Sequence, residues 1–266
     1  MRIALTIAGS DSGGGAGIQA DLKTFHQFGV FGTSVVTAVT AQNTAGVRAW
    51  EAVRPALVVQ QLEAVAEDLA PLAVKSGMLA TAELVDAVAE ALERLRLPNY
   101  VLDPVMVATS GDRLLDHDAE RRIAAALVPR AVLVTPNLAE AAVLVGEEVR
   151  TLEAMERAGR ALLKMGAWAA LVKGGHLEGD GDQIADVLVS RDGVRRLAHP
   201  RLATTSTHGT GCTLSAAVTA GLALGRSLEE SVADAVDFVH RAIAAAPGLG
   251  LHGGHGPLNH FVSARR

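Results

Sequence analysis

Residues 206–215 combine residue types that bind phosphate with the start of a helix. The stretch reads Ser-Thr-His-Gly-Thr-Gly-Cys-Thr-Leu-Ser, and an apolar helix rich in small residues is predicted over residues 212–224. Gly209 and Gly211 carry no Cβ, so the backbone around Thr210 can turn its N–H groups toward a ligand. The first N–H groups of a helix lack internal partners, and the helix dipole adds partial positive charge there. The stretch therefore predicts a site for phosphate, or for negative charge that develops in phosphoryl transfer, with an ordinary capped helix as the alternative.

Two further properties refine this interpretation. No Gly-Lys-Ser/Thr follows the glycines, so the stretch is not a Walker A loop. Cys212, the only cysteine of the chain, stands at the predicted helix start, where the pKa of a thiol tends to fall. That placement favours a functional site over a plain capped helix.

A second glycine-rich stretch, residues 9–17, follows an apolar run at residues 3–8 that is typical of a strand buried on both faces. A strand, a glycine loop and a helix suggest a dinucleotide-binding turn. However, no Gly-x-Gly-x-x-Gly register fits, because its last position falls on Ile18 or Gln19. Four glycines among residues 13–17 indicate instead a backbone that lies close to a ligand, with a flexible turn as the alternative.

Charged and amide side chains follow other predicted strands. Asp103, near the end of a strand predicted over residues 99–106, is a candidate Mg²⁺ ligand or a turn residue. Asn137 and Glu140 follow a strand predicted over residues 131–135. Their spacing is that of a helix capping box, and the same pair can also surround a hydrated Mg²⁺ that bridges phosphates.

Lys173 and Gln42 are the two remaining candidates. Lys173 ends a strand predicted over residues 168–173 and precedes two glycines, where a lysine can contact phosphate. Gln42 follows a strand predicted over residues 34–40. Its carboxamide offers a donor and an acceptor side by side, which matches a ring nitrogen beside an exocyclic amine on an aminopyrimidine. Taken alone, Gln42 is better explained as a solvated loop residue.

These residues need a scaffold that brings several strand ends together. Further strands are predicted over residues 47–53 and 73–79, and residues 184–189 and 194–197 predict a hairpin around Asp192-Gly193. Helices are predicted over residues 18–28, 58–69, 81–95, 137–145, 152–165, 212–224 and 229–246. Alternating strands and helices indicate a largely parallel sheet between helix layers. Ligands bind beyond the carboxyl ends of such strands, so we expect the candidate residues at one edge.

The composition indicates the number of domains, the class of partner and the cellular location. The 266 residues are 49% hydrophobic and 20% charged, which is enough for one α/β domain over residues 1–266. A formal net charge of -5 disfavours a nucleic-acid partner. The chain has one cysteine, no signal-peptide pattern and no apolar run long enough to span a membrane. We therefore expect a soluble cytoplasmic protein without a membrane partner. His252, His255 and His260 lie among glycines without acidic or cysteine partners, so a plain loop is preferred to a metal site there.

Together, these motifs resemble those of the ribokinase-like superfamily and, more narrowly, the hydroxymethylpyrimidine/phosphomethylpyrimidine kinases of thiamine biosynthesis. The matches follow the family's order over nearly the whole chain and are jointly specific. The matching stretches are residues 8–25, 40–44, 102–106, 135–141, 173–176 and 207–215.

The resemblance implies a role for the residues around the predicted helix start. Gly209, Thr210, Gly211 and Cys212 would form the anion hole for the transferred phosphoryl group. Cys212 stands where most sugar kinases of the superfamily carry a catalytic Asp. Either its thiolate or a phosphate oxygen would accept the proton of the substrate hydroxyl.

The resemblance also implies three sets of binding residues. The pyrimidine would be contacted by Gln42, Ala16, Asp21 and Met78. The nucleotide and its phosphates would be contacted by Lys173, Asn137 and Thr207. Mg²⁺ would be held by Asp103 and Glu140. The family commonly has Lys where this chain has Thr109, so a phosphate contact from that loop is not carried over.

The implied activity is Mg-ATP-dependent phosphorylation of hydroxymethylpyrimidine and then of its monophosphate. The implied fold is a three-layer α/β/α domain with a mostly parallel central sheet and a small β lid, commonly as a homodimer. Pyridoxal kinase, or a kinase for both substrates, is the nearest alternative. A nucleotide- or thiamine-responsive binding protein on the same fold and a dehydrogenase are the others.

Overall fold

The computed structural model describes residues 1–106, 117–175, 182–250 and 254–264. Two positions considered above, Thr109 and His252, lie outside these ranges.

A mixed sheet forms the centre of the molecule. Within the described ranges it has eight strands, in the order β10-β9-β8-β7-β6-β5-β1-β2. Their bounds are β1 (Ile3–Ala8), β2 (Phe31–Val36), β5 (Ala73–Ser76), β6 (Tyr100–Leu102), β7 (Leu133–Val134), β8 (Ala170–Val172), β9 (Gln183–Ser190) and β10 (Gly193–Pro200). The strands from β2 to β8 in this order pair in parallel, and the predicted hairpin β9–β10 adds an antiparallel edge. The expectation of a largely parallel sheet is confirmed.

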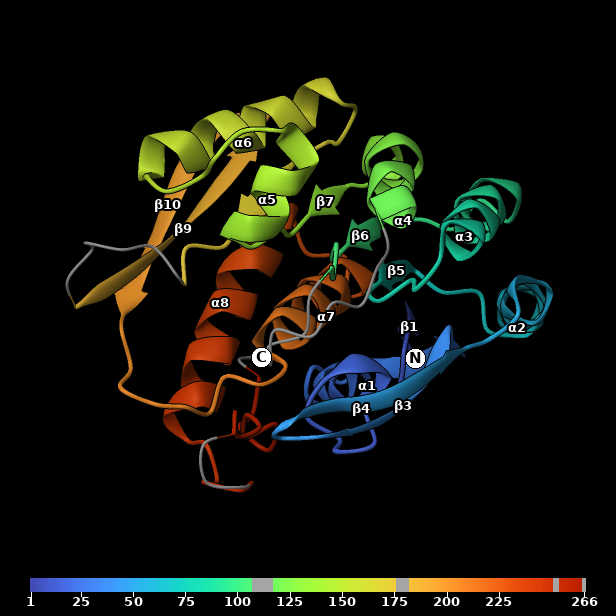
Figure 1. Ribbon diagram of the computed structural model, residues 1–266, viewed down its shortest axis with the longest axis horizontal. Coiled ribbons are helices and arrows are strands. Elements are labelled where there is room, and N and C mark those ends of the chain that lie inside the picture. The colour runs from blue at the N-terminus through green and yellow to red at the C-terminus, as the bar shows by residue number, and fades with distance from the viewer. Residues whose placement is uncertain (107–116, 176–181, 251–253, 265–266) are drawn as a thin grey trace.

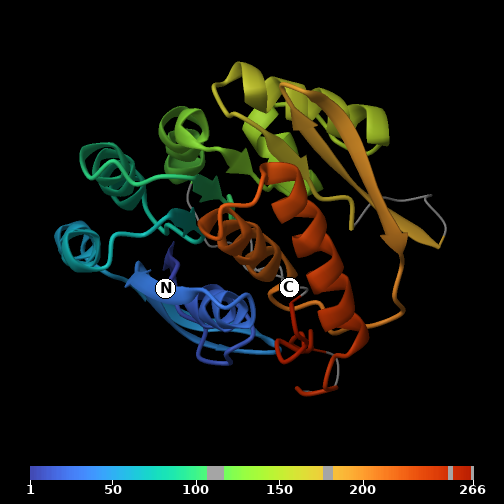
Figure 2. The ribbon, with the colours of Figure 1, turned by 180° about the vertical axis from the view of Figure 1, so that it is seen from behind.

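Helices cover both faces of this sheet (Figures 1 and 2). One layer contains α1 (Gly17–Gln27), α7 (Thr210–Ala223) and α8 (Leu228–Ala244). The other contains α2 (Pro55–Asp68), α3 (Ala82–Arg94), α4 (His117–Arg122), α5 (Leu138–Val145) and α6 (Leu152–Lys164). A π turn (Ile123–Leu127) and a 3-10 turn (Val128–Arg130) continue α4 toward β7.

The continuous apolar strands supply both cores, because successive side chains of a strand point to opposite faces. Ala4 of β1 packs into the core under α1, α7 and α8, whereas its neighbour Leu5 packs into the core under α2 and α3. In β6, Val101 packs into the same core as Ala4, and Leu102 packs into the same core as Leu5. A strand buried on both faces needs no polar alternation, which is why these strands read as apolar runs.

Helix α7 lies in the centre of its layer, between α1 and α8 (Figure 2). Ten of its fourteen residues are buried, which explains its small and apolar composition. At Gly221 a Cβ would lie 2.5 Å from Ser231 Oγ on α8, so a glycine is needed for the two helices to approach this closely.

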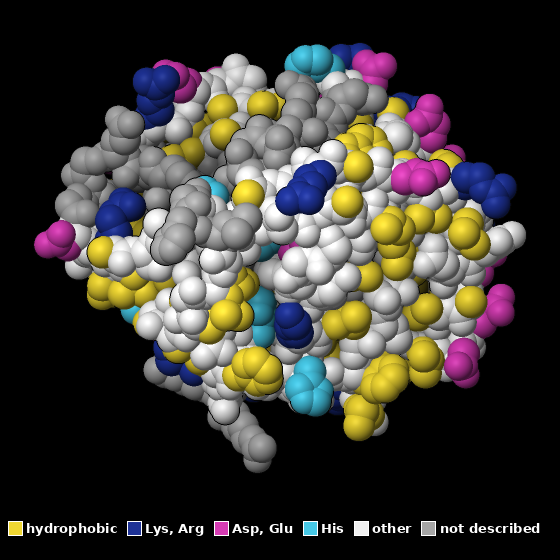
Figure 3. Space-filling view, turned by 60° about the horizontal axis from the view of Figure 1, so that its bottom comes forward, with side chains coloured by type: hydrophobic (Ala, Val, Ile, Leu, Met, Phe, Trp, Pro, Cys, Tyr) yellow, Lys and Arg dark blue, Asp and Glu magenta, His cyan; other side chains and the backbone are white. Residues whose placement is uncertain are grey.

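A small antiparallel sheet of β3 (Ala38–Asn43) and β4 (Gly46–Ala52) stands apart from the main sheet. The prediction of one strand over residues 34–40 is wrong, because the chain changes sheets at Thr37. The Thr37 N–H donates to Ala8 O in the main sheet, while Thr37 O accepts from Val53 N beyond β4. Val39 and Trp50 on this ribbon are 57% and 42% exposed. Figure 3 shows hydrophobic side chains exposed in several groups on the face it presents.

No helix within the described ranges combines the length and apolar character that crossing a membrane requires.

Candidate active site

The predicted site residues gather where the parallel strands end. Asp103 follows β6, Glu140 lies in the first turn after β7, Lys173 follows β8, and the start of α7 faces them. The expectation of one shared strand edge is therefore correct. Segments that are far apart in the sequence meet there because parallel strands all end on the same side.

The start of α7 leaves backbone donors open. Gly209 has φ +83 and precedes the first helical residue, Thr210. The Thr210 N–H bonds to Thr207 O at 3.3 Å. Among the described residues, the N–H groups of Gly211 and Cys212 have no backbone or side-chain acceptor. These donors, at the positive end of the helix dipole, can bind an anionic oxygen.

The thiol of Cys212 differs from the sequence-based expectation. Burial raises its pKa to about 11, although the Lys75 ammonium and a hydrogen bond from the Gly17 backbone oppose that rise. Although the residue is partly exposed, desolvation raises the pKa of this thiol more than Lys75 lowers it, in contrast to the fall that the helix start predicted. The thiol is therefore protonated at neutral pH.

A buried ion pair lies close enough to Cys212 to act on its charge. Lys75 Nζ at the end of β5 contacts Asp21 Oδ2 of α1 at 2.8 Å and Oδ1 at 2.9 Å, and both side chains are 0% exposed. Thr6 Oγ1 donates to Asp21 Oδ2 at 2.6 Å. Asp21 thus has no exposed surface in this structure, and its predicted contact with substrate stays a prediction. It reaches the site through Lys75, which no sequence pattern singled out.

Asp103, Glu140 and Lys173 form the charged cluster opposite α7. Lys173 Nζ lies 3.3 Å from Asp103 Oδ1 and 3.8 Å from Glu140 Oε2. Ser215 Oγ of α7 donates to Asp103 Oδ2 at 3.1 Å. A Cβ on Gly211 would lie 3.2 Å from Lys173 Nζ, so the glycine lets the lysine approach the helix start. This cluster holds two carboxylates and one ammonium within reach of the open N–H groups.

Burial and mutual interaction shift the pKa values of Glu140 and Lys173. Burial raises the pKa of Glu140 to about 7, since Lys173 only partly offsets it and Asp103 adds to it. Burial also disfavours the charged form of Lys173, but Asp103 and Glu140 outweigh burial and raise the pKa of that ammonium. Two carboxylates beside one lysine leave a net negative charge that a cation can neutralise.

Asn137 has the structural role that its spacing predicted. Its Oδ1 accepts from Glu140 N at 2.9 Å, and its N–H donates to Glu140 Oε2 at 2.8 Å, so the capping box of α5 is confirmed. The cap fixes the Glu140 side chain beside Lys173. Thr207, on the opposite side, shares a 3.3 Å contact between its Oγ1 and His255 Nδ1.

The donor set fits a magnesium ion that is bound mainly by phosphates. Asp103 and Glu140 are 2% and 6% exposed at their side chains, and both contact the same lysine. Within the described ranges, no three His, Cys, Asp or Glu side chains form a group that could hold a metal alone. Mg²⁺ commonly takes one or two carboxylates and completes its shell with water and substrate phosphates.

The small sheet brings Gln42 over the glycine loop. Ser12 Oγ accepts from Gln42 N and donates to Gln42 O, both at 2.8 Å. The side chain of Gln42 is partly exposed and accepts from Thr40 Oγ1 at 3.4 Å. Met78 lies under the same loop, because a Cβ on Gly9 would be 3.2 Å from its sulfur. Ala16, also partly exposed, begins α1 beside them.

The glycines of the first loop pack mainly against protein. A Cβ on Gly15 would lie 2.6 Å from His208 Cδ2, and one on Gly17 would collide with Gly9 O. The interpretation of this loop as backbone reserved for a ligand is thus incomplete, because two of its glycines permit close contact between chain segments. Asp11 accepts from three N–H groups of the loop and from His208, a pattern that the sequence did not reveal.

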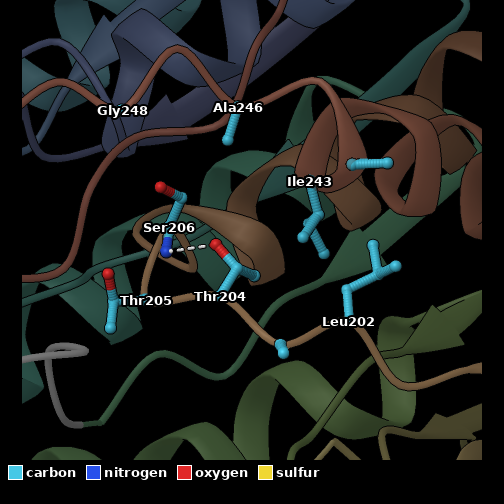
Figure 4. A pocket seen from close by; sticks show the side chains of 9 residues that line it. Leu202, Thr204, Thr205, Ser206, Ile243, Ala246 and Gly248 are labelled. Atoms are coloured by element: carbon cyan, nitrogen blue, oxygen red, sulfur yellow. Dashed lines mark hydrogen bonds between the residues drawn. The ribbon is translucent and has the colours of Figure 1, made fainter.

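An open pocket adjoins the residues before α7 (Figure 4). Leu202 and Ile243 supply apolar surface, and Thr204, Thr205 and Ser206 supply hydroxyl groups. The Ser206 N–H donates to Thr204 Oγ1 at 3.0 Å, which fixes this segment. The pocket is open to solvent and has both apolar and hydroxyl-bearing walls.

Open helix N–H groups beside a lysine and two carboxylates suit phosphoryl transfer, which depends mainly on positioning and charge stabilisation. The fold and the site thus define an α/β phosphotransferase. The Phosphomethylpyrimidine kinase family model matches residues 11–259. The chain belongs to this family.

Similar proteins agree with this assignment. The hydroxymethylpyrimidine/phosphomethylpyrimidine kinase of Rhizobium meliloti (strain 1021) is 52% identical over 260 residues, which cover 97% of each chain. The crystal structure of phosphomethylpyrimidine kinase from Clostridium difficile 630 is 41% identical with a TM-score of 0.82, covering 91% of this chain and 100% of that one.

A pyridoxal kinase is similar at lower identity. The Staphylococcus aureus pyridoxal kinase in complex with AMP-PCP and pyridoxal is 31% identical with a TM-score of 0.87, covering 99% of this chain and 97% of that one. The expectation of a ribokinase-like kinase fold is therefore confirmed, with the small antiparallel sheet beside the main one.

Proposed function

We propose that this kinase phosphorylates the hydroxymethyl group of hydroxymethylpyrimidine with ATP, and then phosphorylates the monophosphate to the pyrophosphate, in thiamine biosynthesis. The observation that carries the proposal is the open start of α7, whose Gly211 and Cys212 N–H groups face Lys173 and Asp103. The name of the Rhizobium meliloti relative supports the pyrimidine as substrate.

In the proposed mechanism the chain binds the transferred phosphoryl group and neutralises its negative charge in the transition state. The N–H groups of Gly211 and Cys212, with Gly209 and Thr210 shaping the turn, receive its equatorial oxygens. Lys173 adds positive charge from the other side. Loss of one such donor typically costs about 3 kcal/mol of barrier lowering.

The raised pKa of Cys212 bears on the proton acceptor. A thiol that is protonated at neutral pH accepts no proton, so it serves as a base only after losing its own. A phosphate oxygen needs no such step. The structure thus favours a phosphate oxygen as the acceptor of the substrate hydroxyl proton, with Cys212 packing beside the reacting groups.

The pyrimidine would lie between the glycine loop and the small sheet. The carboxamide of Gln42 would pair with the amine and ring nitrogen, while Met78 and Ala16 would contact the ring. Asp21 would act only through Lys75, because it has no exposed surface.

The nucleotide would lie along the other side of α7. Its base would occupy the pocket of Leu202 and Ile243, and its phosphates would pass Thr207 toward Lys173 and the N-terminus of α5, capped by Asn137. Asp103 and Glu140 would hold Mg²⁺, which supplies charge neutralisation between the phosphates.

Pyridoxal is the second candidate substrate, and the likeness to the Staphylococcus aureus pyridoxal kinase favours considering it. The test is ADP release with Mg-ATP, comparing hydroxymethylpyrimidine, its monophosphate and pyridoxal. Turnover of both pyrimidines with little on pyridoxal is expected. Turnover of pyridoxal alone would overturn the substrate, and nucleotide binding without ADP release would favour a binding protein.

The variant Gln42→Leu separates the two substrates further. It should reduce turnover of the pyrimidine far more than any turnover of pyridoxal, because only the pyrimidine presents the matching amine and ring nitrogen. A comparable loss on both substrates would remove the argument from Gln42.

We also propose that residues 1–266 act as one domain, since one sheet carries all the buried cores. We propose a homodimer formed through the small sheet, supported by Val39, which is 57% exposed on one face of it. The free thiol of the only cysteine supports a reducing, cytoplasmic location.

A further inference from the structure

Two loops that are far apart in the sequence interlock beside the reacting groups. One is the glycine loop of residues 9–17, and the other is the segment of residues 206–211 that opens α7. A Cβ on Gly209 would collide with Gly15 O. A Cβ on Gly15 would likewise lie 2.6 Å from His208 Cδ2. The position of either loop therefore constrains the other.

The Asp11 carboxylate is the common partner of both loops. Its Oδ1 accepts from Gly13 N at 2.8 Å, and its Oδ2 accepts from Gly15 N at 2.9 Å and Ala16 N at 2.8 Å. His208 Nε2 lies 2.8 Å from the same Oδ2, across a separation of 197 residues in the sequence. Asp11 is only 1% exposed, so no water competes for these contacts.

His208 transmits this contact to the helix start. Its backbone N–H donates to Gly256 O at 3.1 Å, while its ring contacts Asp11, so the residue is held at both ends. His208 immediately precedes Gly209, the residue whose positive φ turns the chain into α7. A shift of the ring would therefore move the N–H groups of Gly211 and Cys212.

We propose that Asp11 is a positioning residue for phosphoryl transfer: it joins the loop beside the substrate to His208 and so fixes the open N–H groups of α7 relative to the acceptor hydroxyl. This inference rests on the proposed function and deepens it, because it assigns the alignment of the two substrates to one buried carboxylate that touches neither. Misplacement by about 1 Å can cost on the order of 100-fold in rate, so such a contact is expected to act on kcat.

The first test compares Asp11→Asn, His208→Leu and the double variant. Both single variants should lower kcat about 10- to 100-fold with KM for ATP and pyrimidine changed less than about 3-fold, because the binding residues remain. The double variant should lose little more than either single variant, since both break one contact. His208→Gln, which keeps an N–H donor, should recover part of the loss.

A matched control is Asp118→Asn on α4, where the carboxylate is 69% exposed and pairs only with Arg121 among the contacts described. It should keep the kcat of the wild type. Thermal unfolding of each variant shows whether it is folded at the assay temperature. Full activity of folded His208→Leu would overturn the proposal, as would losses that simply multiply in the double variant.

A second readout is independent of substrate identity and of turnover. Displacing the glycine loop changes both the exposure of Cys212 and the Gly17 backbone group that favours its thiolate. Iodoacetamide should therefore alkylate this only cysteine at a rate several-fold different in Asp11→Asn from that in Asp118→Asn. An equal rate would overturn the coupling of the loops. Failure of the wild type to release ADP would instead overturn the proposed function, while this alkylation test would still decide the coupling.

Discussion

At the scale of single residues, burial rather than the helix dipole decides the chemistry of the site. Cys212 stands at a helix start, yet desolvation raises the pKa of its thiol to about 11. Glu140 likewise lies in the first turn of α5, but burial raises the pKa of its carboxyl to about 7. At both positions the fold disfavours the charged form of the group, and perturbed pKa values of this kind are common at functional sites.

The thiol provides the first prediction. Alkylation of native wild-type protein by iodoacetamide should be slow at pH 7.5 and should accelerate steadily up to the highest pH at which the fold persists, because only the thiolate reacts. The rate is measured by mass spectrometry over a pH series, with Cys212→Ser as the control that should take up no label. A rate that levels off below pH 8 would contradict the raised pKa.

Glu140 provides the second prediction, from linkage between ionisation and folding. Because the pKa of Glu140 is higher in the folded state than in the unfolded state, ionisation of this carboxyl lowers the free energy of unfolding. The loss of stability grows as the pH rises from 4.5, the pKa of the unfolded state, to about 7, and it is constant at higher pH. Without Mg²⁺ and nucleotide, Glu140→Gln should therefore unfold at a higher temperature than the wild type at pH 8. The difference should shrink as pH falls toward 4.5.

The same variant should lose most of its kinase activity. A carboxamide can replace the carboxylate in the capping box but supplies no charge for Mg²⁺. Thermal unfolding in EDTA gives the stability, and ADP release gives the activity. A Glu140→Gln protein that is less stable than the wild type at pH 8 would show that the negative charge stabilises the apo fold.

At the scale of elements, the close packing of α7 against α8 positions the helix start. Ala is favoured over Gly in a helix by about 1 kcal/mol, so propensity alone would make Gly221→Ala stabilising. However, the added Cβ would lie 2.5 Å from Ser231 Oγ and 2.8 Å from its Cβ. Overpacking of a core costs about 1–3 kcal/mol, and α8 cannot yield without moving its buried face.

We therefore expect Gly221→Ala to lower the free energy of unfolding, measured by urea denaturation. The double variant Gly221→Ala, Ser231→Gly should recover part of the loss, because it removes the atoms that the new methyl group meets. A single variant as stable as the wild type would mean that α7 and α8 can separate slightly at no cost.

At the scale of the whole molecule, the small sheet carries two of the large hydrophobic side chains that the fold leaves exposed. Val39 and Trp50 are exposed on a ribbon that only two strands form, and such ribbons rarely stand alone in water. The register pairs Val39 with Glu51 and Thr40 with Trp50, so Val39 and Trp50 lie on opposite faces of the ribbon. Association of two copies through the face that carries Val39 would cover that side chain.

Val39→Arg should therefore shift the protein from dimer to monomer in sedimentation velocity, because it places a charge within the apolar contact. The control is Trp168→Arg, since Trp168 is also half exposed but lies before β8 at a different part of the molecule. If both variants sediment as the wild type does, the small sheet is not the dimer contact.

The sequence determined most of the elements and their order, because local patterns carry that information, although it did not predict α4. Apolar runs buried on both faces predicted the parallel strands, and the spacing of Asn137 and Glu140 predicted the capping box of α5. The glycines at 209 and 211 predicted the helix start, and motif order predicted the kinase family. The placement of Asp103, Glu140 and Lys173 together followed from parallel strands ending at one edge.

Only the tertiary structure decided which neighbours each side chain meets, since those contacts join segments that are distant in the sequence. The run at residues 34–40 has one β-like pattern but divides between two sheets at Thr37, because strand propensity does not specify the pairing partner. Asp21 reads as a helix residue near a substrate loop, yet its partner is Lys75 on another strand. The ionisation of Cys212 follows from burial, which depends on everything packed around it and which no local pattern reports.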